Sequence, residues 1–216
     1  MYQPPHFRED DPATQHALIR AHPLGLLITA EADGAPVANL IPFHLDGAPG
    51  KGRLLGHMAR ANRQWQAIRD GARVLVVFQG EEAYISPSWY AAKAETGKVV
   101  PTWNYAVVQV RGPARAIEDR DWLRHQVGLI TGEHEGKRAA PWAVEDAPPP
   151  FVEAQLKGIV GVEIAIAEIE GKWKVSQNRP EADIAGVTAG LEDAASAHNN
   201  PAMAALVRER GSKRQS

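Results

Sequence analysis

The chain has 216 residues, 44% hydrophobic and 23% charged, which is the make-up of a globular protein with one sizeable core. It contains no cysteine, which excludes disulfides, thiolate metal ligands and thiol chemistry, and its formal net charge of -2 argues against a globally basic nucleic-acid binder. The N-terminus shows no apolar leader, and "PLGLLITA" is too short to cross a bilayer. We therefore expect a cytoplasmic protein without a membrane partner.

The first half of the chain predicts a helix followed by a meander of strands. Asp11-Pro12 marks the start of the helix, which Pro23 stops. Strands are expected on both sides of Asp33-Gly34, a dipeptide typical of hairpin turns, and again in "RLLGHM". A short helix in "ARANRQWQAIRDG" and a buried strand in "ARVLVVFQG" complete this part.

The second half predicts a long strand, two helical segments, a hairpin and a helical end. The strand "TWNYAVVQVRGPARAIE" is expected to bulge or bend near Gly112-Pro113. Helical patterns follow in "DRDWLRHQVGLITGEHE" and "APPPFVEAQLKGI", and "VGVEIAIAEIEGKWKVS" alternates like a hairpin turning at Glu170-Gly171. Because strands adjoin through tight turns, the order favours a mainly antiparallel β barrel with peripheral helices, an α+β fold.

Motifs of common enzymes and metal sites are missing. The sequence has no G-x-G-x-x-G, P-loop, H-E-x-x-H or G-x-S-x-G motif. Glu133-His134-Glu135 lacks a second histidine at ligand spacing, so a solvated helix end is favoured and no metal is expected. His44 and His57 fit structural roles as well as acid–base roles, so no catalytic residue is predicted.

A basic segment without acidic residues extends from Lys51 to Arg69. The order "GHMARANRQW" places Arg60, Asn62 and Arg63 where a strand is expected to turn into a helix. Backbone N–H groups at a helix start, together with arginine, favour a phosphate. A solvated basic face is the plain alternative.

Residues 86–110, "SPSWYAAKAETGKVVPTWNYAVVQV", concentrate aromatic and hydrogen-bonding side chains. Each aromatic residue taken singly fits a core or a subunit contact. The polar turn formers "SPS" and "TGK" interrupt them, and this mixture suits a planar ligand with polar edges. The candidate cofactor-binding residues of this segment are Trp89, Lys98, Trp103 and Asn104.

Several segments in chain order carry a family resemblance: "NLIPFHLD", "LLGHMARANRQW", "YISPSWY", "TGKVVPTWNY" and "EGKWKVSQNRP". They resemble the PaiB-type family of FMN-binding negative transcriptional regulators, from Met1 to about Gly190. The resemblance implies an FMN-binding split-barrel domain over residues 1–190, followed by a C-terminal helix and polar tail over 191–216. It also implies FMN as the cofactor and a homodimer with the flavin at the subunit interface, distantly similar to pyridoxamine phosphate oxidases.

The same resemblance implies positions for the cofactor. The strand that is similar to the one along the flavin ring contains Asn39, Leu40, Ile41, Pro42 and Phe43. "GHMARAN" resembles the segment that meets the FMN phosphate, with Arg60, Asn62 and the nearby His57. "WKVSQNRP" resembles the oxidase pattern W-K-x-x-R-L-x-P, but Gln177 replaces the arginine that grips the phosphorylated substrate. A neutral amide does not replace a bidentate grip, so that oxidase activity is not expected.

Three functions are compatible with these observations. The first is a flavin-binding regulator that acts indirectly, through its ligand or a partner. No basic recognition helix is apparent, and the late basic residues lie in the polar tail, so direct DNA binding stays open. The second is an FMN-dependent oxidoreductase or flavin reductase, and the third is a barrel that binds haem or a deazaflavin.

Overall fold

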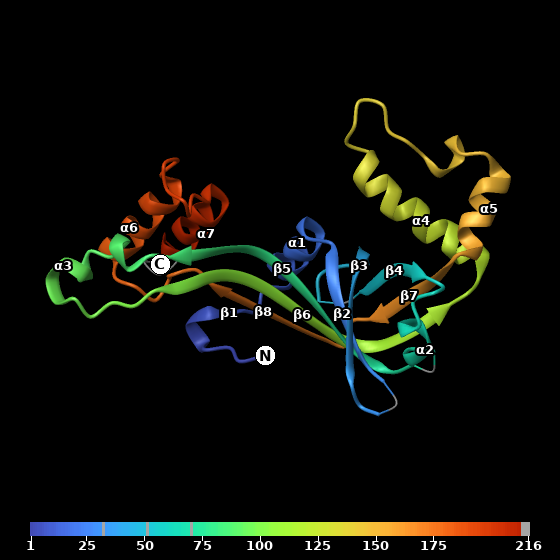
Figure 1. The fold of residues 1–216 in the computed structure, drawn as a ribbon, viewed down its shortest axis with the longest axis horizontal. Coiled ribbons are helices and arrows are strands. Elements are labelled where there is room, and N and C mark those ends of the chain that lie inside the picture. The colour runs from blue at the N-terminus through green and yellow to red at the C-terminus, as the bar shows by residue number, and fades with distance from the viewer. Residues whose placement is uncertain (32, 51, 70, 213–216) are drawn as a thin grey trace. The chain divides into compact units, whose positions relative to one another are not determined.

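The computed structural model describes residues 1–31, 33–50, 52–69 and 71–212 (Figure 1). Lys51 of the basic segment and the tail residues Lys213 and Arg214 lie outside these ranges. The chain divides into two compact units. We call the one made of Asp11–Phe78 and Gln109–Ile169 the barrel unit. The other, made of Met1–Asp10, Gln79–Val108 and Glu170–Ser216, is called the aromatic unit because it contains the aromatic segment.

Each unit has its own set of elements. The barrel unit contains α1 (Pro12–Ala21), β2 (Leu24–Ala30), β3 (Pro36–Asp46), β4 (Arg53–Ala59), α2 (Gln64–Ala67), α4 (Arg120–Glu135), η3 (Val144–Asp146), α5 (Pro149–Lys157) and β7 (Ile159–Ala165). The aromatic unit contains η1 (Pro5–Phe7), β1 (Arg8–Glu9), η2 (Pro87–Trp89), α3 (Ala92–Thr96), α6 (Glu181–Glu192) and α7 (Pro201–Ser212). Strands β5 (Arg73–Ile85), β6 (Thr102–Ile117) and β8 (Glu168–Lys174) have residues in both.

Strand pairing in the barrel unit forms a closed ring. The order is β6-β5-β2-β3-β4-β7, and an additional pairing of β7 with β6 returns to the start. β2 with β3, β3 with β4 and β7 with β6 are all antiparallel. Alternate side chains fill the interior, where the rings of Phe43 and Phe78 meet edge to face at 6.0 Å. The predicted antiparallel α+β fold is confirmed.

Local signals at the start of the chain are confirmed by the structure. The Asp11 carboxylate accepts hydrogen bonds from the backbone N–H of Ala13 and Thr14, which caps α1. The hairpin between β2 and β3 turns at Gly34, whose φ of 85° suits glycine, while Asp33 Oδ1 accepts a hydrogen bond from Ala35 N.

The predicted hairpin at Glu170-Gly171 is wrong. β7 pairs with β4 and β6, whereas β8 pairs with β1 and β6, and Gly171 lies inside β8 opposite Glu9. The chain leaves β7 at Ala165, whose carbonyl oxygen would be only 1.7 Å from a Cβ on Gly112. Gly112 is therefore needed for this close approach of two backbones, and β6 continues through it.

Helices α4 and α5 lie beside β4 and β7 in the barrel unit (Figure 1). Leu123, Val144, Val152 and Leu156 form a small core between α4, η3 and α5. Trp122 packs directly over Gly161 of β7, where an added Cβ would lie 2.3 Å from the indole ring. The absence of a side chain at Gly161 thus sets how closely α4 approaches the sheet.

Gly161→Ala is expected to lower the free energy of unfolding by about 1–3 kcal/mol, because the methyl group must displace the Trp122 ring from a packed site. Urea denaturation measures the loss. The control is Gly128→Ala in α4, where nothing lies within 4 Å and alanine should add up to about 1 kcal/mol. Equal effects of the two substitutions would show that the Trp122 contact does not limit packing.

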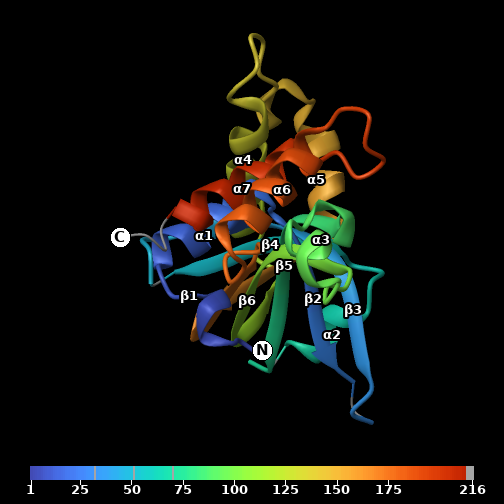
Figure 2. The same cartoon turned by 90° about the vertical axis from the view of Figure 1, so that its left-hand side faces the viewer.

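Helices α6 and α7 lie side by side in the aromatic unit (Figure 2). Val187, Leu191, Met203 and Val207 are fully buried on them. α6 also packs on Trp89, because added Cβ atoms would lie 2.4 Å from the indole at Gly190 and 2.0 Å from its backbone oxygen at Gly186. Among the described residues, no helix is both long and apolar enough to cross a membrane.

Candidate functional site

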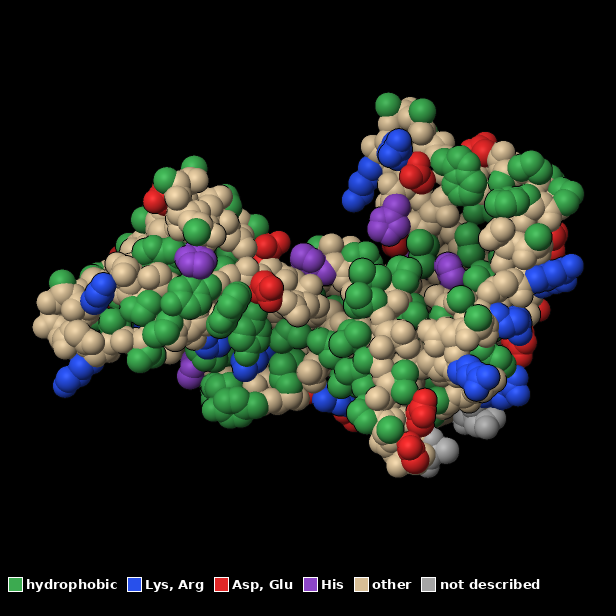
Figure 3. Space-filling model, viewed as in Figure 1, with side chains coloured by type: hydrophobic (Ala, Val, Ile, Leu, Met, Phe, Trp, Pro, Cys, Tyr) green, Lys and Arg blue, Asp and Glu red, His purple; other side chains and the backbone are tan. Residues whose placement is uncertain are grey.

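The strands β2, β3 and β5 carry apolar side chains on the outer side of the barrel unit. Residues that alternate with them, such as Leu27 and Val76, point inward and are fully buried. We call this set of cross-strand neighbours the outer apolar face: Leu26, Ile28, Ala38, Leu40, Leu75 and Val77. None of its members is buried, and Leu40 is 59% exposed. Figure 3 shows hydrophobic side chains where β2 lies. A sheet that is apolar on both of its faces typically has both faces covered.

The predicted flavin strand, 39–43 in β3, divides between the two faces of the sheet. Ile41 and Phe43 are 4% and 2% exposed and belong to the barrel core. Leu40 and Pro42 lie on the outer side, where they are exposed and half-buried. A ring lying along β3 therefore meets the side chains of Leu40 and Pro42.

Gln64, at the start of α2, is a buried residue that sequence reasoning missed. Its Oε1 accepts a hydrogen bond from Asn39 Nδ2 at 3.0 Å, and its backbone N–H donates to Asn62 Oδ1 at 3.1 Å. Its Nε2 donates to the carbonyl oxygens of Leu27 and Val37. Gln64 thus joins two predicted site residues and fixes the start of α2 against β2 and β3.

Arg60 follows β4, as predicted, but its guanidinium is occupied by the chain itself. Nη1 lies 2.6 Å from Glu118 Oε2, while Nε and Nη2 donate to the carbonyl oxygens of Lys157 and Ile159. The hydrogen bond from Arg60 holds the pKa of Glu118 below its usual value. Arg60 therefore ties the end of α5 to the start of β7.

Arg63 is an exposed cation of the same segment. Within the described ranges its side chain has no hydrogen-bond or ion-pair partner. Helix α2 has only four residues, fewer than the sequence suggested, so the favourable effect of a helix start on an anion is small here. A phosphate at this place would depend on Arg63 and Asn62.

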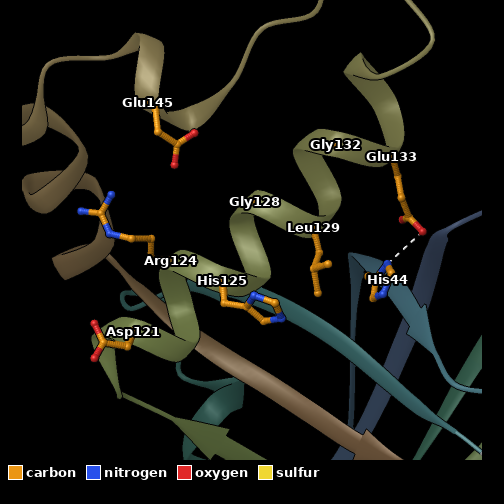
Figure 4. Close-up of a pocket in the computed structure, with 9 residues that line it drawn as sticks. All are labelled: His44, Asp121, Arg124, His125, Gly128, Leu129, Gly132, Glu133 and Glu145. Atoms are coloured by element: carbon orange, nitrogen blue, oxygen red, sulfur yellow. Dashed lines mark ion pairs between the residues drawn. The ribbon is translucent and has the colours of Figure 1, made fainter.

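A groove of about 670 Å³ runs along α4 in the barrel unit (Figure 4). His44 Nδ1 lies 2.8 Å from Glu133 Oε1, while His125 and Leu129 point from α4 toward the strands. His57 Nδ1 lies 2.7 Å from Oε1 of the buried Gln126, so His57 helps to dock α4. No group of three potential ligands able to hold a metal ion occurs among the described residues.

In the aromatic unit, Trp103 is 54% exposed and lines two cavities, of about 310 and 460 Å³. Its ring meets Tyr84 edge to face at 5.9 Å, and Tyr84 lies 4.8 Å from the His198 ring. Lys98 is exposed, whereas Trp89 is used to pack α6. Trp103 is thus the candidate aromatic residue that is open to a ligand.

The remaining two predicted residues are tied into the turn after β8. Asn104 is buried and exchanges hydrogen bonds with the hydroxyl of Ser176. Gln177 Oε1 accepts from Val175 N, and its Nε2 donates to the Trp173 carbonyl oxygen at 2.5 Å. Gln177 therefore folds back on its own turn. The predicted site residues fall in both units, eight in the barrel unit and five in the aromatic unit.

Comparisons with known proteins identify relatives along most of the chain. A family model described as "Putative FMN-binding domain" matches residues 1–168. The protease synthase and sporulation protein PAI 2 of Bacillus subtilis is 33% identical over 193 residues, covering 89% of this chain and 90% of the relative. An uncharacterized protein of Emericella nidulans is 36% identical over 229 residues, covering 90% and 91%. The FAD and haem binding protein from Mycobacterium smegmatis has a similar fold, with a TM-score of 0.57 and 18% identity over 77% of this chain and 73% of that one.

Proposed function

Since this chain belongs to the family described as "Putative FMN-binding domain" and takes FMN as its cofactor, we propose that it is a flavoprotein regulator. In this proposal, a homodimer holds FMN at the subunit interface and influences gene expression indirectly, through its ligand or a partner. FMN supplies a redox-active ring when bound, and the protein binds and orients it.

The outer apolar face carries this proposal. An exposed leucine on three neighbouring apolar strands is costly in water, and a second copy placed over it would bury that surface. The same face offers a dry wall for a planar ring. Nearby in sequence, the cationic Arg63 and the amide of Asn62 have the chemistry that suits a phosphate, so the residues present fit FMN.

The basic residues near the C-terminus favour an indirect mode of regulation. Arg208 pairs with Glu192, and Arg210 lies 2.5 Å from Glu9 and packs over the Trp173 ring. Both cations are thus neutralised within their own unit, which disfavours a contact of either one with DNA phosphates. The name of the Bacillus subtilis relative, a protease synthase and sporulation protein, supports a regulatory role.

The two cavities at Trp103 favour an alternative function, an FMN-dependent oxidoreductase or flavin reductase. Their volumes, about 310 and 460 Å³, lie in the range of small-molecule sites. The discriminating experiment follows NADH and NADPH oxidation by the purified, FMN-loaded protein under air. Rapid turnover of either would favour the enzyme, and its absence with intact flavin would favour the regulator.

FMN is expected to bind at least about tenfold more tightly than riboflavin, because a charge-assisted hydrogen bond to the phosphate contributes about 1.5–3 kcal/mol. Quenching of flavin fluorescence during titration of the apoprotein measures both constants. Arg63→Gln should reduce the difference in affinity between FMN and riboflavin. Arg120→Gln changes an exposed arginine that pairs with Glu153 and should leave this difference unchanged. Equal affinity of the wild-type protein for both flavins would remove the proposed phosphate site.

A further inference from the structure

A cavity of about 160 Å³ in the aromatic unit is lined by cations and hydrogen-bonding groups without any acidic residue. Lys174 of β8 and Arg179 of the following turn bring two positive charges to it. The buried Asn104 and the adjacent Asn178 add amide groups. A small polar space with two cations in its wall has the composition of an anion site.

Lys174 is held firmly at the cavity. Its ammonium group donates to Thr102 Oγ1 at 2.5 Å and to the carbonyl oxygen of Trp103. Burial, followed by the positive charges of Lys172 and Arg179, lowers the pKa of Lys174. Burial and the neighbouring cations therefore disfavour the charged form of Lys174, and an anion in the cavity would stabilise it.

The hydroxyl of Tyr90 gives an independent sign of a ligand. Tyr90 lines the cavity and is 3% exposed. Among the described residues, its buried hydroxyl has no hydrogen-bond partner. The Arg179 guanidinium lies 4.7 Å from the centre of its ring. Burial raises the pKa of Tyr90, so the phenol is a neutral donor at neutral pH. The nearby buried carboxylate, Asp183, accepts its hydrogen bond from Ala92 N.

We propose that this cavity binds the carboxylate or phosphate group of a small second ligand, distinct from FMN, through Lys174, Arg179 and the Tyr90 hydroxyl. The volume is below the 300–1,000 Å³ of sites that enclose a whole small molecule, so it holds the anionic end only. This inference goes beyond the proposed function and does not depend on the dimer.

The test is calorimetric titration of the FMN-loaded, full-length protein with inorganic phosphate and, separately, with acetate. We expect saturable binding of at least one of them at one site per chain. Arg179→Gln and Lys174→Gln should each weaken it about tenfold or more, as expected for loss of a charged hydrogen bond. The matched controls, Arg208→Gln and Lys93→Gln, remove cations of the same unit that bond to Glu192 and Ser88, and they should change nothing.

Tyr90→Phe keeps the experiment decisive if Lys174→Gln fails to fold. It removes only the unpartnered hydroxyl and should weaken binding severalfold without loss of stability. Absence of saturable binding of both anions, or binding that none of the three substitutions affects, would overturn the proposal. Binding that occurs only in flavin-free protein and disappears with FMN would assign the cavity to the flavin's own phosphate. That outcome would also overturn the second ligand, while leaving the flavoprotein proposal intact.

Discussion

Leu40→Arg is expected to yield flavin-free monomers at micromolar protein concentration. Leu40 lies in the outer apolar face, and an arginine there would bury an unpaired charge once a second copy covers it. The cost is several kcal/mol, enough to weaken the dimer by about a thousandfold. Since arginine attracts an anionic cofactor, loss of FMN could not be ascribed to charge repulsion. Sedimentation and flavin absorbance of the purified variant measure the two effects.

Two variants control for this substitution. Val100→Arg changes an equally exposed apolar residue of the aromatic unit and should remain a yellow dimer. Leu40→Met retains an apolar side chain and should behave like the wild-type protein. If Leu40→Arg remained a flavin-loaded dimer, this would contradict the assignment of the outer apolar face to dimerisation and to flavin binding. A wild-type protein that sediments only as the 23.5 kDa chain would refute the dimer itself.

Elements with local signals were predictable, and those that depend on distant partners were not. The cap at Asp11 and the turn at Gly34 act within a few residues, so α1 and the first hairpin follow from the sequence. The alternation of apolar and polar residues through β7 and β8 is the same whether these strands pair with each other or with different neighbours. Only the contact of Ala165 with Gly112, which are 53 positions apart, separates the two cases.

The candidate site shows the same limit. Strand periodicity is enough to separate Leu40 on the outer face from Ile41 in the core, although both belong to the strand expected along the flavin ring. Motif comparison singled out Gln177, whereas the cations at the nearby cavity are Lys174 and Arg179. The partners of Arg60 lie 58 to 99 residues further along the chain, so no local pattern could reveal them.

Arg60→Glu is expected to lower both the free energy of unfolding and the affinity for FMN. From sequence alone, a surface arginine would contribute little to stability. In the structure, the substitution removes two hydrogen bonds to the carbonyl oxygens of Lys157 and Ile159 and places a carboxylate beside Glu118. We expect a loss of about 2–3 kcal/mol in urea denaturation and about a hundredfold weaker FMN binding.

Arg69→Glu is the control, since Arg69 also lies near Glu118, at 3.5 Å, but makes no bond to those carbonyl oxygens. It should keep both stability and affinity close to wild type. The double variant Arg60→Glu with Glu118→Arg separates the effect of position 60 on stability from its effect on FMN binding, because it restores the ion pair with the two charges exchanged. We expect its stability to recover in part while FMN binding stays weak, because the carboxylate at position 60 still repels a phosphate held by Arg63 and Asn62. Full recovery of FMN affinity would mean that Arg60 affects FMN only by fixing the junction of α5 and β7, and that the charge at position 60 does not act on the phosphate.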